Sequence, residues 1–206
     1  MTLSISLIII IITCLVSYTA LKNYDQLDKM SLQPYMVKRY KQYYRFITSG
    51  FVHADFQHLI FNMLTLFFFG PAIENLFMQL FHSKLVYILY YLLGIIVANI
   101  PSYIKHRNNS SYSSLGASGA ISAVVFSAIM IDPWNTIFLF FIPIPAVIYG
   151  VLFLALSAYM SRKGGDNINH DAHMWGALFG IVFPLIFHPE LGAYFLEMLK
   201  HPRFGR

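Results

Sequence analysis

Charged side chains are scarce in this sequence of 206 residues. Asp, Glu, Lys and Arg make up 11% of the chain and hydrophobic residues 57%, and the mean hydropathy is +0.59. A soluble domain of this length carries about 25% charged residues. The deficit excludes an ordinary soluble protein and predicts a polytopic membrane protein, with a single domain over residues 1–206.

Cysteine clusters and zinc-protease motifs are also missing. The single cysteine, Cys14, excludes an intramolecular disulfide and a metal site built from cysteines. No His-Glu-x-x-His sequence is present, which argues against a metalloprotease. The net charge of +5 is spread over loops and forms no basic stripe interleaved with aromatics. We therefore expect neither a cofactor nor a nucleic-acid partner.

Long apolar runs are abundant, and six of them are candidates to cross a bilayer. Each is predicted to be a helix, because a chain in lipid must satisfy its backbone hydrogen bonds internally. The N-terminus lacks the positive charges of a signal peptide, so the first run is expected to be retained. A polar and aromatic stretch, residues 22–57, follows it, and a short stretch at 191–199 is expected at the membrane interface. The six runs are residues 3–21, 58–81, 85–104, 116–131, 135–160 and 172–187.

Polar residues that could take part in catalysis lie at the start of every second run. His58 and Asn62 begin the second run, Ser118 the fourth and His173 the sixth. Alternate helices of a polytopic protein start from the same face of the membrane, so these residues are expected at similar depth. Nucleophilic and ionisable groups at membrane depth are costly and by default mark function. The parity of the runs predicts one polar site near one face.

Ser118 and His173 are the candidate nucleophile and base. Ser118 would lie in the first turn of its helix, flanked by Gly116 and Gly119, although small residues alone are equally typical of membrane helix packing. His173 shares a helix face with Gly176 and Gly180, a face that permits close approach to the helix of Ser118. A neutral imidazole within reach could take the serine proton; a structural histidine is the alternative. His170, one turn earlier, is the rival base.

The pair His58 and Asn62 supplies hydrogen-bond donors on one helix face. Such donors suit an oxyanion hole together with the backbone N–H of Ser118, and a polar cap of the helix is the alternative. His53, in the preceding loop, is expected to support their orientation. Glu74 lies about 18 Å further along the same helix and is expected to be structural. Asp171 faces away from His173 and is not assigned to a triad.

Taken together, these residues resemble the rhomboid family of intramembrane serine proteases. The resemblance runs from about Tyr44 to Phe187 and rests on the joint occurrence of several motifs in one order. They are Tyr44-Arg45, His53, His58-Leu59-Ile60-Phe61-Asn62, Gly70 with Glu74, Gly116-Ala117-Ser118-Gly119, and His173 with Gly176 and Gly180.

The resemblance implies an all-α, six-transmembrane-helix bundle with a long interfacial loop between the first two helices. It implies a Ser118–His173 dyad without a catalytic acid, an oxyanion site made by His58, Asn62 and the Ser118 N–H with Gly116 beside it, and structural support from Arg45. The implied activity is cleavage of transmembrane protein substrates within the lipid bilayer. A catalytically silent relative that binds membrane clients is the alternative. A transporter is a third hypothesis, which the composition alone allows.

Two features depart from simple expectation. Many members of this family carry an aromatic four residues after the serine, against the histidine ring; here that residue is Ser122, and we expect Trp175 or a neighbouring Phe to hold the ring. Lys and Arg gather on the candidate site's side, which would place that side in the cytoplasm. The resemblance implies the opposite: a bacterial inner membrane protein with an extracytoplasmic site. The helix over 135–160, which carries Pro143 and Pro145, is the expected gate for substrate.

Overall fold

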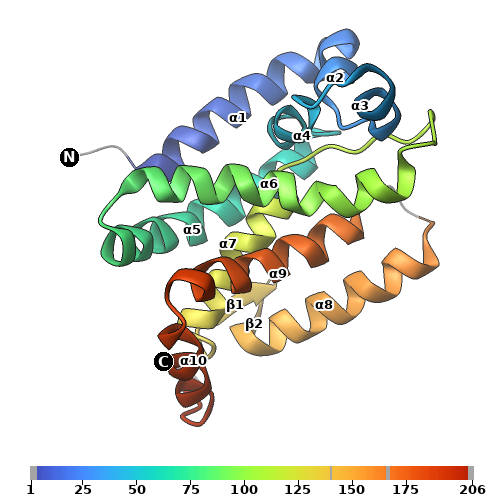
Figure 1. Cartoon of the computed structure of the whole chain (residues 1–206). Helices are drawn as coiled ribbons and strands as arrows, with labels where there is room; N and C mark the ends of the chain where they lie inside the picture. Colours follow the sequence, from blue (N-terminus) through green and yellow to red (C-terminus); the bar gives the residue numbers. More distant parts are fainter. Residues whose placement is uncertain (1–3, 140, 166–167, 204–206) are drawn as a thin grey trace.

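The computed structural model describes residues 4–139, 141–165 and 168–203, most of them in helices (Figure 1). A small antiparallel hairpin interrupts the helical order between α7 and α8. The elements are α1 (Ile5–Leu21), α2 (Tyr24–Met30), α3 (Pro34–Tyr40), α4 (Arg45–Thr48), the 3-10 turn η1 (Ser49–Phe51), α5 (Phe56–Phe81), α6 (Lys84–His106), α7 (Ser118–Ile131), β1 (Thr136–Leu139), β2 (Ile142–Pro145), α8 (Ala146–Lys163), α9 (His170–Phe187) and α10 (Glu190–Leu199).

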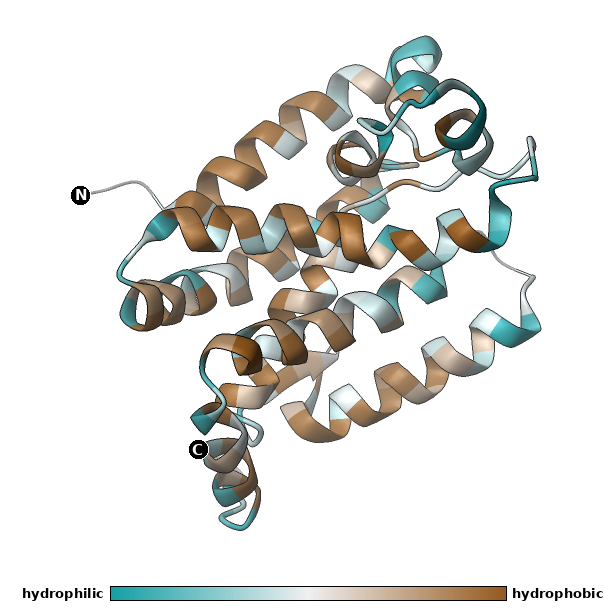
Figure 2. Ribbon diagram, in the orientation of Figure 1, coloured by the Kyte–Doolittle hydropathy of each residue, from teal (hydrophilic) through white to brown (hydrophobic). Residues whose placement is uncertain are grey.

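The apolar runs of the sequence form helices close to the predicted bounds. Among the described helices, α5 and α6 are long and apolar enough to cross a membrane, and α1 and α7 are shorter apolar helices. Apolar residues dominate the middle of the long helices, and polar residues gather at their ends (Figure 2). Helix α9 begins two residues earlier than predicted and α7 two residues later. The predicted start of the first run, residue 3, lies outside the described residues.

The prediction of a single helix over residues 135–160 is wrong for residues 135–145. Strands β1 and β2 pair antiparallel there, with Ile137 opposite Ile144. Pro143 and Pro145 each lack an N–H and would break a helix interior. Both are accommodated on β2, and the N–H of Ala146 then donates to the Asn135 carbonyl at 2.8 Å. Helix α8 therefore begins only at Ala146, and the all-α expectation holds for the chain apart from this hairpin.

Helix α7 lies at the centre of the molecule, between α5, α6 and α9 (Figure 1). Its contact with α9 is a direct approach of two backbones. A Cβ added to Gly176 would lie 2.1 Å from the Gly119 carbonyl oxygen, and one added to Gly180 would lie 2.2 Å from that of Ala123. Only glycine fits at these two positions of α9, so the predicted glycine face is the interface with the serine helix.

The segment from residue 22 to residue 57 folds into short helices that gather at one end of the long helices (Figure 1). Arg45 is buried there, at 2% exposure. Its Nη1 donates to the carbonyls of Asp28 and Ser31 at 2.6 and 2.8 Å, and its Nε donates to Gln42 Oε1 at 2.7 Å. These bonds satisfy carbonyls at and just beyond the C-terminal end of α2, so Arg45 holds the short helices together.

Glu74 joins two helices far from the candidate site. Its carboxylate accepts hydrogen bonds from the backbone N–H groups of Ile5 and Ser6, at 3.0 and 3.1 Å, and from the Ser4 hydroxyl at 2.6 Å. The first N–H groups of a helix lack intrahelical partners, and a negative charge is favourable beside them. Lys84 Nζ lies 3.8 Å from the same carboxylate. Glu74 of α5 thus caps the start of α1.

Candidate active site

The polar residues singled out in the sequence converge on one cavity. This cavity has a volume of about 840 Å³, and Ser118, His173, His58 and Asn62 all line it. They come from the N-terminal parts of α7, α9 and α5. The remaining walls include the loop before α7 and aromatic side chains of α8. A serine hydroxyl, two imidazoles and an amide therefore share one open cavity.

Ser118 is the first residue of α7, where backbone N–H groups are free of intrahelical partners. Gly116, two residues earlier, adopts φ +117°, a conformation that favours glycine. A Cβ at Gly116 would lie 2.6 Å from Cε1 of His58, so the missing side chain makes room for that ring. The Gly116 N–H donates to the Ser49 carbonyl at 2.8 Å. The turn before Ser118 is thereby fixed against both α5 and η1.

His173 lies in the first turn of α9, one turn before Gly176, where α9 touches α7 most closely. Its ring lies 5.5 Å from the ring of Phe153 on α8, tilted by 31°. A neighbouring phenylalanine is one of the two ring supports expected, and Phe153 is in that position; Trp175 is 44% exposed. The rival base His170 begins the helix, 5.8 Å from His173 between ring centres, and is not among the residues that line the 840 Å³ cavity.

His58 and Asn62 face the cavity from α5, one turn apart. The Asp55 side chain caps this helix by accepting the His58 N–H at 2.7 Å. One N–H of the Asn62 amide donates to the His58 carbonyl at 3.0 Å, and the amide carries a second N–H. Asn62 is 7% exposed, which holds that amide at a fixed depth on the cavity wall.

His53 is completely buried between α1 and the turn before α7. Its Nδ1 lies 2.9 Å from the Ser17 hydroxyl, which itself donates to the Phe51 carbonyl, and its Nε2 accepts the Ala117 N–H at 3.4 Å. This pattern requires a neutral ring with its proton on Nδ1. Burial, reinforced by the nearby His58 and only partly opposed by Asp55, lowers the pKa of His53 to about 3. The expected supporting histidine therefore braces the residue before Ser118.

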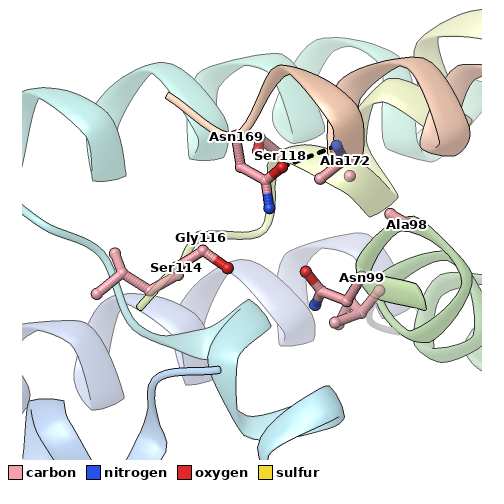
Figure 3. A pocket seen from close by; sticks show the side chains of 10 residues that line it. Ala98, Asn99, Ser114, Gly116, Ser118, Asn169 and Ala172 are labelled. Atoms are coloured by element: carbon pink, nitrogen blue, oxygen red, sulfur yellow. Dashed lines mark hydrogen bonds between the residues drawn. The ribbon is translucent and has the colours of Figure 1, made fainter. Parts of the chain in front are cut away.

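A second, much smaller cavity of about 10 Å³ lies beside Ser118 (Figure 3). The side chains of Asn99 and Ser114 and the backbone of Gly116 border it on one side, and Asn169 lies across from them. The volume is about that of one water molecule, and the polar lining meets the requirement for holding one. Asn169 also caps α9 by accepting the Ala172 N–H at 3.0 Å.

Several supporting residues have no clear signal in the sequence. Ser127 of α7 donates to the Gly180 carbonyl at 2.6 Å and bonds the Tyr90 hydroxyl at 2.7 Å. A serine inside an apolar helix signals a buried partner but does not identify it. Asp171, which the sequence excluded from a triad, binds Lys105 at 3.2 Å and the Ser161 hydroxyl. Its carboxylate ties α6 and α8 to the start of α9.

Ser118, His173, His58 and Asn62 thus share one cavity in a helical membrane protein. A model of the rhomboid domain matches residues 40–190, which include every residue lining that cavity. The chain belongs to the rhomboid family.

Three relatives are similar over much of the chain. "RHOMBOID-like protein 12, mitochondrial" of Arabidopsis thaliana is 34% identical over 64% of this chain and 42% of its own length. "Putative rhomboid protease YdcA" of Bacillus subtilis (strain 168) is 28% identical over 70% of this chain and 67% of its own. "Rhomboid-like protein 11, chloroplastic" of Arabidopsis thaliana is 31% identical over 72% and 54%. The chain thus spans about half the length of the two plant relatives it matches.

Proposed function

We propose that the protein is an intramembrane serine endopeptidase that cleaves transmembrane segments of membrane proteins. The observation that carries the proposal is the convergence of Ser118, His173, His58 and Asn62 on one cavity. Family membership and the name of the Bacillus relative support the same reaction class. The proposal includes six spans, with α8 and α9 as the last two, and a site on the extracytoplasmic side of a bacterial inner membrane.

In the first half of the reaction the Ser118 hydroxyl attacks the carbonyl carbon of the scissile peptide bond. His173 takes the hydroxyl proton as general base. Negative charge develops on the carbonyl oxygen, where the Ser118 N–H, the Asn62 amide and the His58 ring are the candidate donors. The C–N bond then breaks, His173 returns the proton to the leaving amine, and an acyl group remains on Ser118.

In the second half a water molecule must reach the acyl-enzyme. His173 removes a proton from the water, the oxygen attacks the ester carbonyl, and Ser118 leaves with the proton restored. The 10 Å³ cavity beside Ser118 offers a protected position for such a water, next to the carbon that it would attack. Its polar lining supports a hydrolytic outcome inside an otherwise apolar protein.

Substrate is expected to enter between α5 and α8. The cavity lies between them, with Phe61 and Thr65 on one wall and Tyr149 and Phe153 on the other. Helix α8 buries only Ala146, Gly150 and Ser157 along its length. A helix with so little buried surface can separate from its neighbours at low cost, which supports α8 as the moving wall.

The decisive test uses Ser118→Ala and His173→Ala proteins with a model transmembrane substrate in detergent. We expect cleavage to fall by about three orders of magnitude or more in each variant. The matched controls are Ser110→Ala in the exposed loop before α7 and His201→Ala beyond α10, and both should cleave normally. Full activity in either dyad variant contradicts the proposal.

A catalytically silent protein that binds membrane clients is the second candidate. The small side chain of Ser122, where many members of the family carry an aromatic, is the observation that favours it. A serine-directed fluorophosphonate separates the two functions, because it reacts only with an activated serine. Labelling of the parent protein that disappears in Ser118→Ala supports the protease, and its absence in the parent supports the silent protein. A reporter fused to the C-terminus tests the proposed orientation.

A further inference from the structure

The imidazole of His173 is covered by an aromatic side chain that comes from α8. The rings of Phe153 and His173 lie 5.5 Å apart at 31°. Phe153 is itself held on two sides, 5.8 Å from the ring of Phe126 on α7 and 5.8 Å from that of Tyr149 one turn earlier on α8. All four rings line the 840 Å³ cavity.

The serine helix contributes no ring at the corresponding depth. Ser122 lies one turn after Ser118, lines the same cavity and is 6% exposed. Its side chain ends at a hydroxyl and offers no flat apolar surface. The terminal torsion of histidine is broad, and an aromatic ring packed against an imidazole restricts it. The Phe153 ring lies against the His173 ring, and the His170 ring also contacts it.

We propose that Phe153 is a positioning residue that holds the His173 ring in the orientation that accepts the Ser118 proton. The proposal rests on the protease function described above. Its consequence is a coupling between the wall of the site and the chemistry, because the ring that orients the base belongs to α8, which has the fewest buried residues of the helices that line the cavity. When α8 separates from α7 and α9 to admit substrate, His173 loses this contact. Proton transfer therefore waits until α8 closes.

The experiment compares four single substitutions in purified protein. Phe153→Ala removes the ring, Phe153→Leu keeps apolar volume without a ring, and Phe153→Tyr keeps the ring. Leu152→Ala is the matched control, because this neighbouring side chain on α8 is 55% exposed and faces away from the cavity lining. The measurements are the rate of fluorophosphonate labelling, kcat and KM for a transmembrane substrate, and the temperature of unfolding in detergent.

We expect labelling and kcat to fall about three- to tenfold in Phe153→Ala and Phe153→Leu, the range that corresponds to one aromatic pair. The loss should be larger in kcat than in KM, because the proposed role of the ring is to orient the base. Phe153→Tyr, which keeps the ring, should label faster than Phe153→Leu, and Leu152→Ala should match the parent. Adding Ser122→Tyr to Phe153→Ala should restore labelling, because it supplies a ring from α7 instead. A residue needed only for folding would not be rescued in this way.

The outcomes distinguish this proposal from the one on which it rests. Unchanged labelling and kcat in a folded Phe153→Leu protein overturn the positioning role while the dyad stands. Loss of labelling in Phe153→Leu that Ser122→Tyr does not restore also overturns it. If Ser118→Ala leaves cleavage intact, the protease function itself is wrong. Should Phe153→Ala lower the unfolding temperature strongly, Phe153→Leu with and without Ser122→Tyr decides the question.

Discussion

Helices α8 and α9 both line the cavity, yet they are held in different ways. The backbone of α9 lies directly on α7 at Gly176 and Gly180. At the corresponding glycine of α8 the contact is with a side chain: a Cβ added to Gly150 would lie 3.1 Å from the flexible end of Ile129. His173, the proposed base, is thus carried by a helix that cannot move away from α7 without breaking close packing. The proposed substrate-facing wall is carried by α8, which has no such backbone contact at Gly150.

The largest expected effect is on the backbone contact between α7 and α9. Gly180→Ala places a Cβ 2.2 Å from the Ala123 carbonyl oxygen, and a backbone atom cannot move aside locally. We expect α7 and α9 to separate, with a loss of about 3 kcal/mol or more of stability and of nearly all cleavage. Unfolding in detergent and cleavage of a transmembrane substrate measure the two effects.

The same substitution on α8 is the control. Gly150→Ala places a Cβ 3.1 Å from Ile129 Cδ1 and 3.5 Å from the Phe126 ring, atoms at the ends of side chains. The stability of this variant should change by less than about 1 kcal/mol, because alanine also favours the helix. Equal losses in Gly150→Ala and Gly180→Ala would show that the two helices are held alike and would remove the basis of the comparison.

Tethering α8 to α5 tests whether α8 must move to admit substrate. Cysteines placed at Phe61 of α5 and Tyr149 of α8, in a Cys14→Ser background, can be joined by a thiol crosslinker across the cavity. Transmembrane substrate cleavage should drop at least tenfold, a large effect because a closed gate blocks entry. Fluorophosphonate labelling should continue, since the small probe needs no opening of α8. Each single-cysteine protein treated with the same reagent is the control, and undiminished cleavage in the linked protein would show that α8 does not gate.

The candidate site residues could be predicted from the sequence because the patterns that mark them are local. The step from His173 to Gly176 and Gly180 defines a helix face, and the positions of Ser118 and His58 follow from the parity of the spans. The hairpin was missed because a run of apolar residues satisfies a strand as well as a helix. The prolines at 143 and 145 were the available signal.

Contacts that join distant parts of the chain could not be anticipated. Ser17 and Ala117 meet His53 across 36 and 64 residues. Nothing in either local pattern distinguishes them from other small residues of apolar helices. The sequence predicted a phenylalanine beside the His173 ring but did not identify Phe153, because that contact joins α8 to α9.

Ser127→Ala tests the hydrogen bonds between α7 and α9, with a smaller expected effect on stability. Its hydroxyl links Tyr90 of α6 to the Gly180 carbonyl of α9, so removing it leaves a buried phenol and a carbonyl without this partner. We expect a loss of about 1–3 kcal/mol in unfolding free energy, with kcat little changed because the glycine contacts remain. Adding Tyr90→Phe should recover part of the loss, since the orphaned hydroxyl is then gone. An unchanged stability in Ser127→Ala would mean that the glycine contacts alone fix α9.

The smallest expected effect is the loss of stability at acid pH that the buried His53 ring causes. The pKa of this ring is about 3 in the folded protein, against about 6.5 in an unfolded chain. Between those values the unfolded chain binds more protons, so stability rises with pH through this window and is lost as pH falls below about 6.5. The slope contributed by this one residue is at most about 1.4 kcal/mol per pH unit.

His53→Gln keeps hydrogen-bonding groups but does not titrate, so its unfolding free energy should fall less steeply between pH 6.5 and 5 than that of the parent. Equal slopes in the parent and His53→Gln would mean that His53 is protonated in the folded protein, and the Ala117 N–H would then have lost its acceptor and α7 its brace to α1.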